Sequence, residues 1–113
     1  MALLRNDEKI ALEKLKVRVR KQFAIRKMIL FGSKARNDEN DDSDIDILLL
    51  VDNRVDDNTR WILSDIVTEV EWDTDIYFSC RLYNYLDWEK ENEDVIFLPF
   101  KDNVTRDGEW LEV

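Results

Sequence analysis

Apolar residues follow two spacings along the chain, one typical of helices and one typical of strands. Segment 6–23 has an apolar residue at every fourth position and basic residues off that stripe, which predicts an amphipathic helix. Segment 55–71 repeats this pattern and predicts a second helix, capped by Asp56 or Asp57. The two predicted buried stripes are Ala11, Leu15, Val19 and Phe23, and Ile62, Leu63, Ile66, Val67 and Val70.

Three other segments have the patterns of strands. Segment 27–31 is a short apolar run that ends at Gly32, and segment 44–51 is almost continuously apolar after its first residues. The second pattern is typical of a strand in the middle of a covered sheet. Segment 72–80 alternates between polar and apolar positions, so we expect a third strand there.

Two short helices are expected near the end of the sequence. Asn84 has an acid three residues later and resembles a capped helix start, so a helix is predicted to about residue 92. Another begins near Pro99 and ends at Gly108. The order α-β-β-α-β-α-α indicates an α/β or α+β fold, with helices packed on a small sheet.

The composition limits the possible chemistry. At 113 residues and 44% hydrophobic content, the chain is expected to form one domain over residues 1–113 with a real core. It has no histidine, so catalysis would rest on carboxylates, hydroxyls, basic side chains or bound hard metals. We expect no signal peptide, no membrane segment and a cytoplasmic location. The single cysteine, Cys80, is expected to pack in the core.

The net charge of −9 is unevenly distributed. Residues 1–36 contain 11 Lys and Arg but only 3 Asp and Glu, and most acids follow. The basic third could face an anionic partner, or it could pair with the acidic remainder of the chain. We favour the second interpretation. A nucleic-acid partner is not expected, because nothing in the chain resembles a nucleic-acid-gripping domain.

Asp44 and Asp46 form the first candidate site, at the start of the second predicted strand. Residues two apart on a strand point to the same face, ~6.5–7 Å apart along it. Two carboxylates so placed can share a Mg²⁺ ion. Alternatively, both could lie at a solvated strand end that continues the acidic loop before them.

Gly32, Ser33 and Arg36 form a second candidate site, directly after the first strand. Glycine allows the backbone to approach a phosphate closely, the Ser33 hydroxyl adds a donor, and Arg36 adds a charge-assisted contact. A plain tight turn would account equally well for a Gly-Ser pair alone. The order is the informative feature, because a phosphate cradle precedes a carboxylate pair by one strand.

A third acid could complete the metal site. Asp73 and Asp75 share one face of the third predicted strand, so either could point at it. Spacing alone does not choose between them.

The run Gly32-Ser33-Lys34-Ala35-Arg36, followed by Ser43-Asp44-Ile45-Asp46, resembles the signature of the DNA polymerase beta-like nucleotidyltransferase superfamily. It is most similar to the minimal, single-domain (MNT-type) branch, and the resemblance covers residues 27–80. It implies a small mixed sheet flanked by helices. It also implies triphosphate contacts from Gly32, Ser33 and Arg36 and Mg²⁺ ligation by Asp44, Asp46 and a third acid. The family pattern favours Asp75 over Asp73.

The resemblance implies transfer of a nucleoside monophosphate, with AMP expected, from a nucleoside triphosphate such as ATP to a hydroxyl of a protein or small molecule. As an alternative, it implies an antitoxin-type binding module that neutralises a HEPN-type ribonuclease toxin, with or without nucleotidylation. A separate protein partner is expected in both cases, with the basic face of the first helix, Trp88 and Trp110 as candidate contacts. For both tryptophans we favour packing in the core over a role as contacts. Asn37 replaces the glycine that the family usually has after its arginine, which bears on catalytic efficiency.

Overall fold

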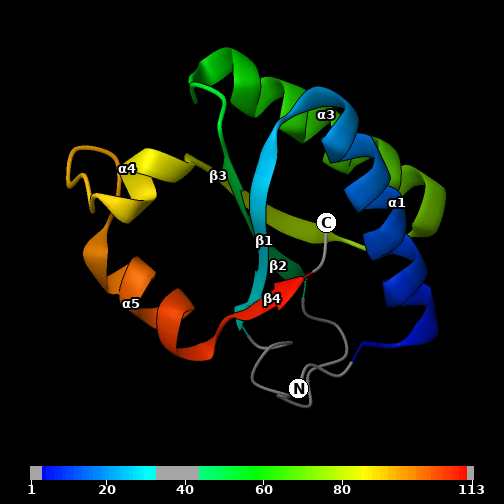
Figure 1. Cartoon of the computed structure of the whole chain (residues 1–113). Helices are drawn as coiled ribbons and strands as arrows, with labels where there is room; N and C mark the ends of the chain where they lie inside the picture. Colours follow the sequence, from blue (N-terminus) through cyan, green and yellow to red (C-terminus); the bar gives the residue numbers. More distant parts are fainter. Residues whose placement is uncertain (1–3, 33–43, 112–113) are drawn as a thin grey trace.

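A mixed four-stranded sheet forms the centre of the molecule (Figure 1). The computed structural model describes residues 4–32 and 44–111. The strands lie in the order β3-β2-β1-β4, with β1 antiparallel to both β2 and β4, and β2 parallel to β3. They span Ile25–Phe31 (β1), Ile45–Val51 (β2), Phe78–Asn84 (β3) and Glu109–Leu111 (β4).

Helices cover both faces of the sheet. The long helices α1 (Asn6–Gln22) and α3 (Asp57–Thr74) lie on one face, and the short helices α4 (Tyr85–Glu89) and α5 (Leu98–Asp107) lie on the other (Figure 1). Asp56 caps α3, because its carboxylate accepts the Thr59 amide at 2.9 Å. The predicted small sheet flanked by helices is confirmed.

Two apolar clusters lie on opposite faces of the sheet. Alternate residues of β2 supply both, which explains why this strand is apolar almost throughout. Ile45, Ile47, Leu49 and Val51 face α1 and α3, whereas Leu48 and Leu50 face α4 and α5. All four residues of the predicted stripe of α1 are buried, as are Leu63, Ile66, Val67 and Val70 of α3.

The third predicted strand was placed wrongly. Helix α3 continues through Thr74, where the Thr74 hydroxyl donates to the Val70 carbonyl at 2.7 Å and Asp73 pairs with Arg18 of α1. Asp75 ends the helix in a left-handed conformation, with φ 57°, and donates its amide to the Glu71 carbonyl. The strand begins only at Phe78. The expectation that Asp73 and Asp75 share one face of a strand is therefore wrong.

Strand β4 was not predicted. It contains only three residues and pairs with β1 after α5 ends at Gly108. A Cβ atom on Gly108 would lie 2.4 Å from the Val104 carbonyl oxygen and 2.7 Å from Cγ2 of Ile29. The glycine therefore permits the close turn that returns the chain to the sheet.

Ion pairs join the basic first third of the chain to the acidic remainder. Arg18 of α1 pairs with Asp73 and Glu69 of α3, and Arg26 of β1 pairs with Asp52 at 2.8 Å. The expected intramolecular charge balance is confirmed for these groups. Over residues 4–32 and 44–111, no helix is long and apolar enough to cross a membrane.

Candidate active site

Asp44 and Asp46 lie at the amino-terminal end of β2. Asp44 immediately precedes the strand and is exposed, whereas Asp46 is half-buried within it. Asp46 is flanked by Phe31 of β1 and Ser79 of β3. The alternation of β2 places Asp46 on the face of α4 and α5, next to Leu48, and away from α1 and α3.

Gly32 brings the backbone directly against the Asp46 carboxylate. It has φ +72°, a conformation that other residues rarely adopt. A Cβ atom built on it would lie 2.0 Å from Oδ2 of Asp46. Only a residue without a side chain fits there, so the glycine that follows β1 and the second acid of the pair form one local structure.

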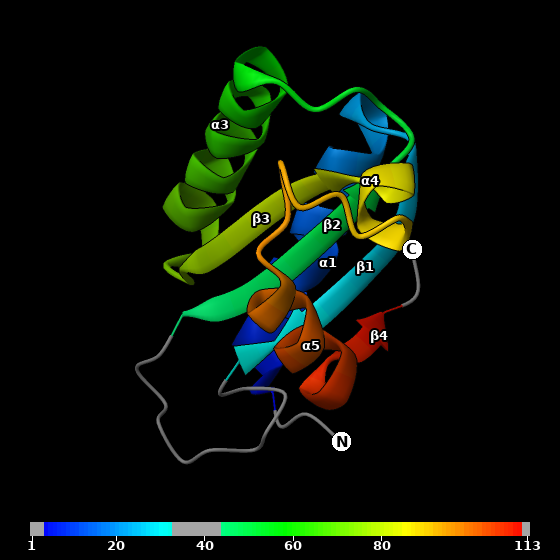
Figure 2. The same cartoon turned by 90° about the vertical axis from the view of Figure 1, so that its left-hand side faces the viewer.

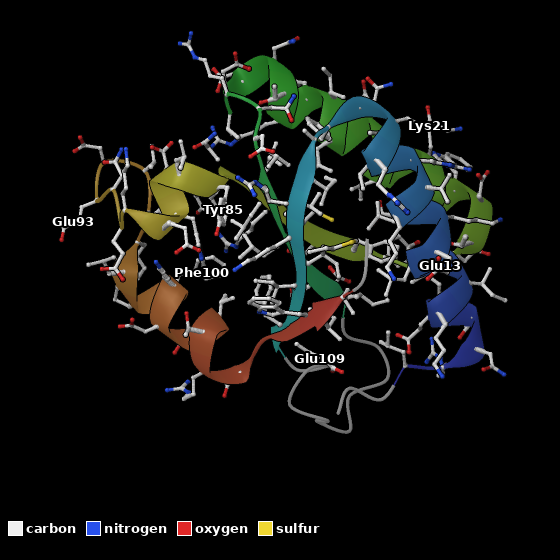
Figure 3. The ribbon with its side chains drawn as sticks, viewed as in Figure 1. Glu13, Lys21, Tyr85, Glu93, Phe100 and Glu109 are labelled. Carbon is white, nitrogen blue, oxygen red and sulfur yellow. The ribbon has the colours of Figure 1, made fainter. Side chains whose placement is uncertain are left out.

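Ser79 and Arg81 of β3 are site neighbours that the sequence analysis missed. Ser79 lies opposite Asp46, and Arg81 lies opposite Leu48, so both share the face of that acid. Arg81 rests over the ring of Phe100, 4.7 Å from its centroid. Figure 3 labels Phe100, which projects from α5 toward the sheet. A strand register starting at Phe78 would have identified both residues, but the predicted strand ended at Cys80.

The two candidates for the third acid lie in different surroundings. Asp73 is in α3 and pairs with Arg18 of α1, on the opposite face of the sheet from Asp46. The hydrogen bond and charge of Arg18 lower the pKa of Asp73. Asp75 is exposed and lines a hollow at the end of α3 with Thr68, Glu71, Trp72 and Tyr77.

Part of the predicted site lies outside the described residues. Ser33 and Arg36 belong to the segment 33–43, as does Asn37. Among the residues that the structure does describe, no three His, Cys, Asp or Glu side chains group closely enough to hold a metal ion. The described site therefore consists of Gly32, Asp44 and Asp46, with Ser79 and Arg81 beside them.

The donor set of the described site suits a hard divalent cation. Asp44 and Asp46 offer carboxylate oxygens, which Mg²⁺ prefers, at the amino-terminal end of the central strand β2. Mg²⁺ commonly takes one or two carboxylates and completes its coordination with water and substrate phosphates. Two acids beside a close backbone approach therefore fit a magnesium-bound triphosphate.

Cys80 lies on the other face of β3 and packs against the core that α1 and α3 cover. Burial, together with the charges of Glu71 and Asp46, raises its pKa to about 12. The expectation that Cys80 packs in the core is confirmed, and its thiol is protonated at neutral pH.

Comparison with known families identifies the fold. The model of the family "Polymerase beta, Nucleotidyltransferase" matches residues 13–104, a span that contains the described site. No curated protein matches the sequence significantly.

Solved structures with a similar fold include toxin–antitoxin complexes. A mutant of the toxin–antitoxin MntA–HpeT matches with a TM-score of 0.60 and 20% sequence identity, over 96% of this chain and 73% of that one. A toxin–antitoxin with AMP-PNP gives the same four values. A second MntA–HpeT mutant is 18% identical, with the same TM-score and coverage.

Proposed function

Because this chain belongs to the polymerase beta nucleotidyltransferase family, we propose that it transfers a nucleoside monophosphate from a nucleoside triphosphate to a hydroxyl group of a protein or small molecule. One observation supports this most directly. Gly32 follows the end of β1 and the two acids lie at the start of β2, with the glycine backbone against the Asp46 carboxylate. ATP is the proposed donor, and the AMP-PNP in a structure of the same fold supports that choice.

In the proposed reaction the acceptor hydroxyl oxygen attacks the α-phosphorus, and the bond from that phosphorus to the bridging oxygen breaks. Pyrophosphate leaves with the electron pair, and the hydroxyl proton passes to a nearby base. Asp44 and Asp46 would hold Mg²⁺ against the triphosphate, and the bound cation supplies charge stabilisation for the phosphoryl oxygens. Gly32 would let its backbone approach a phosphate, with Ser33 and Arg36 as further contacts.

Asp75 remains the proposed third acid, from the resemblance noted above. It precedes β3 by three residues, whereas the β3 residue opposite Asp46 is Ser79, a hydroxyl. Substitution can separate these positions. Asp75→Asn should reduce transfer as strongly as Asp46→Asn if Asp75 contributes a ligand or base, and unchanged transfer would remove it from the site.

The decisive experiment measures label transfer from α-labelled ATP with Mg²⁺, using the protein together with its native partner as acceptor. Asp44→Asn and Asp46→Asn should lower transfer by at least about 100-fold, the usual range for charge-stabilising groups. Asp65→Asn is the matched control, because Asp65 is an exposed acid of α3 on the opposite face of the sheet. Absence of transfer by the wild type would count against the enzymatic proposal.

A second candidate function is an antitoxin-type module that binds and neutralises a protein partner, for which a HEPN-type toxin is proposed. The similar solved structures are toxin–antitoxin complexes, and this chain exposes several large apolar side chains. Trp88 is buried, in agreement with the favoured expectation of core packing, and is excluded as a contact, whereas Trp110 is exposed and stays a candidate. Asp44→Asn should still co-purify with the partner. Loss of the complex in that variant would show that partner binding depends on the active-site acid.

A further inference from the structure

Strand β3 forms an outer edge of the sheet, and half of its backbone groups face away from β2. The Ile45 amide donates to the Tyr77 carbonyl at 3.0 Å, and the parallel register pairs Ile45 with Phe78. In such a ladder the outward backbone groups belong to Phe78, Cys80 and Leu82. The Phe78 amide is already occupied, since it donates to Oε2 of Glu71 at 3.0 Å. The backbone groups of Cys80 and Leu82 therefore point toward the outer side of the strand.

A groove runs along this edge, between β3 and α3. Figure 2 shows α3 standing outside β3, beyond the edge of the sheet. The groove has a volume of about 460 Å³, and small polar side chains of α3, Ser64 and Thr68, form part of its wall. Edge strands are usually blunted or covered, whereas Phe78, Cys80 and Leu82 of this one line the groove.

Exposed aromatic side chains mark both ends of the groove. Arg60 and Ser64 line the groove and also a neighbouring hollow that includes Trp61, whose exposed fraction is 69%. At the other end, Thr68 and Glu71 are shared with a hollow that includes Trp72 and Tyr77, 83% and 61% exposed. Trp61 and Trp72 are eleven residues apart on α3, or roughly 16 Å. A strand of about five residues has the same length.

We propose that this groove binds an extended segment of a partner protein, which adds a strand to the β3 edge and places an acidic side chain near Arg60. The outward groups of Cys80 and Leu82 would form the new ladder, as in other cases of strand addition. The exposed tryptophans would clamp apolar side chains at its ends, because Trp is enriched among residues that dominate binding energy. This surface serves the partner-binding function proposed above. The inference rests on that proposal in one respect, namely that the ligand of the groove is a protein.

The charges of the groove determine the chemistry of the segment. Arg60 lines the groove, is exposed and, among the described residues, forms no ion pair. Glu71 and Asp75 lie at the opposite end, near the start of β3. A bound segment should therefore have an acid at the Arg60 end and no acid at the Glu71 end.

A second copy of this chain fits the groove poorly. Pairing two β3 edges would bring each copy's α3 toward the same space, because α3 stands outside the strand (Figure 2). Segment 78–84 also contains no acid that could meet Arg60. An unattached strand avoids both problems.

The test pans a display library of random eight-residue peptides against the full-length protein. Enriched peptides should alternate apolar and polar residues and contain an Asp or Glu. Binding of the synthetic peptide, measured by fluorescence polarisation, should weaken by about tenfold or more in Arg60→Glu and in Trp61→Ala. Changing the peptide's acid to Lys should restore binding to Arg60→Glu. Phe97→Ala should leave affinity unchanged, since Phe97 is 70% exposed but lies at the start of α5, on the opposite face of the sheet from α3.

Amide hydrogen exchange locates the bound peptide. Peptide binding should slow exchange at Cys80 and Leu82 and leave β4 unaffected. The proposal is overturned by any of three results: no enrichment, peptides that bind Arg60→Glu and Trp61→Ala as well as the wild type, or protection elsewhere. If the protein forms a dimer in which the Cys80 and Leu82 amides exchange slowly in the absence of peptide, the occupant of the groove is a second copy. None of these results depends on nucleotide transfer, so failure here and failure of the enzymatic proposal are separable.

Discussion

Gly32 shows how one residue couples backbone conformation to the candidate site. Gly32→Ala should cost about 1–2 kcal/mol of folding stability, because its φ of +72° is unfavourable for a residue with a Cβ atom. It should also displace the Asp46 carboxylate, which lies 2.0 Å from the position of the new atom. Urea unfolding and the thermal shift produced by Mg²⁺ with ATP measure the two effects.

Gly108→Ala is the matched control for that substitution. Its Cβ atom would also clash, with the Val104 carbonyl oxygen at 2.4 Å, but at the end of α5 rather than beside an acid. It should lower stability while the nucleotide-induced shift persists. Loss of the nucleotide response in both variants would attribute the effect of Gly32→Ala to general destabilisation.

The chemistry of Cys80 follows from its burial. Its pKa rises from an ordinary value of 9.0 to about 12, because burial and nearby negative charges disfavour the thiolate. The thiolate is the reactive form, so iodoacetamide labelling at pH 8 should be about a thousandfold slower in the folded protein than in urea. Mass spectrometry after timed quenching measures the ratio. Labelling at similar rates in both conditions would contradict the buried environment.

At the scale of elements, long periodic segments were predictable and short or ambiguous ones were not. Helix α1 was predicted to within one residue at its carboxyl end, because its apolar stripe repeats without interruption. Residues 72–80 alternate in polarity, which favours a strand, and the apolar stripe of the preceding helix ends at Val70, so no local pattern shows that the helix continues to Thr74. Packing against α1 favours the helix. Strand β4 has only three residues, and its pairing with β1 is a tertiary contact that no local pattern reveals.

The ion pair between α1 and α3 should make the free energy of unfolding depend on pH in acid. Arg18 lowers the pKa of Asp73 below 3.8 in the folded state, so the pair stabilises the fold above that value. This contribution is lost as the pH falls through the lowered pKa of Asp73. Asp73→Asn should therefore unfold at lower urea concentration than the wild type at pH 7, and the difference should shrink as the pH falls below 3.8 and vanish below the lowered pKa of Asp73. The loss should be small, because the pair is partly exposed.

Glu69→Gln provides the comparison for Asp73→Asn. Its carboxylate lies 3.9 Å from Nη1 of Arg18, a longer contact on the same helix. The urea midpoint of this variant should change less than that of Asp73→Asn at pH 7. A difference between Asp73→Asn and the wild type that stays constant from pH 7 to well below pH 3.8 would show that the carboxylate charge does not stabilise the helix pair.

At the scale of the whole molecule, the sequence predicted the fold class and the acids of the site, but it did not predict the β3 residues beside them. Asp44 and Asp46 were identifiable because two acids interrupt an otherwise apolar strand. Their neighbours Ser79 and Arg81 were not, because the partner of Asp46 depends on the register between β2 and β3. The parallel pairing of those strands around α3 is a non-local feature, and it determines which residues meet.

The overall charge makes nucleotide binding dependent on a cation. A chain with net charge −9 and two acids at the site should repel a free triphosphate, whereas Mg²⁺ neutralises both groups at their point of contact. ATP with Mg²⁺ at about 100 times its dissociation constant should stabilise the fold by roughly 2.7 kcal/mol, which raises the melting temperature by about 10 °C. ATP with EDTA should produce almost no shift, and Asp46→Asn should remove the response to Mg²⁺ with ATP while Asp65→Asn retains it. An equal shift with and without the cation would mean that ATP binds away from Asp44 and Asp46.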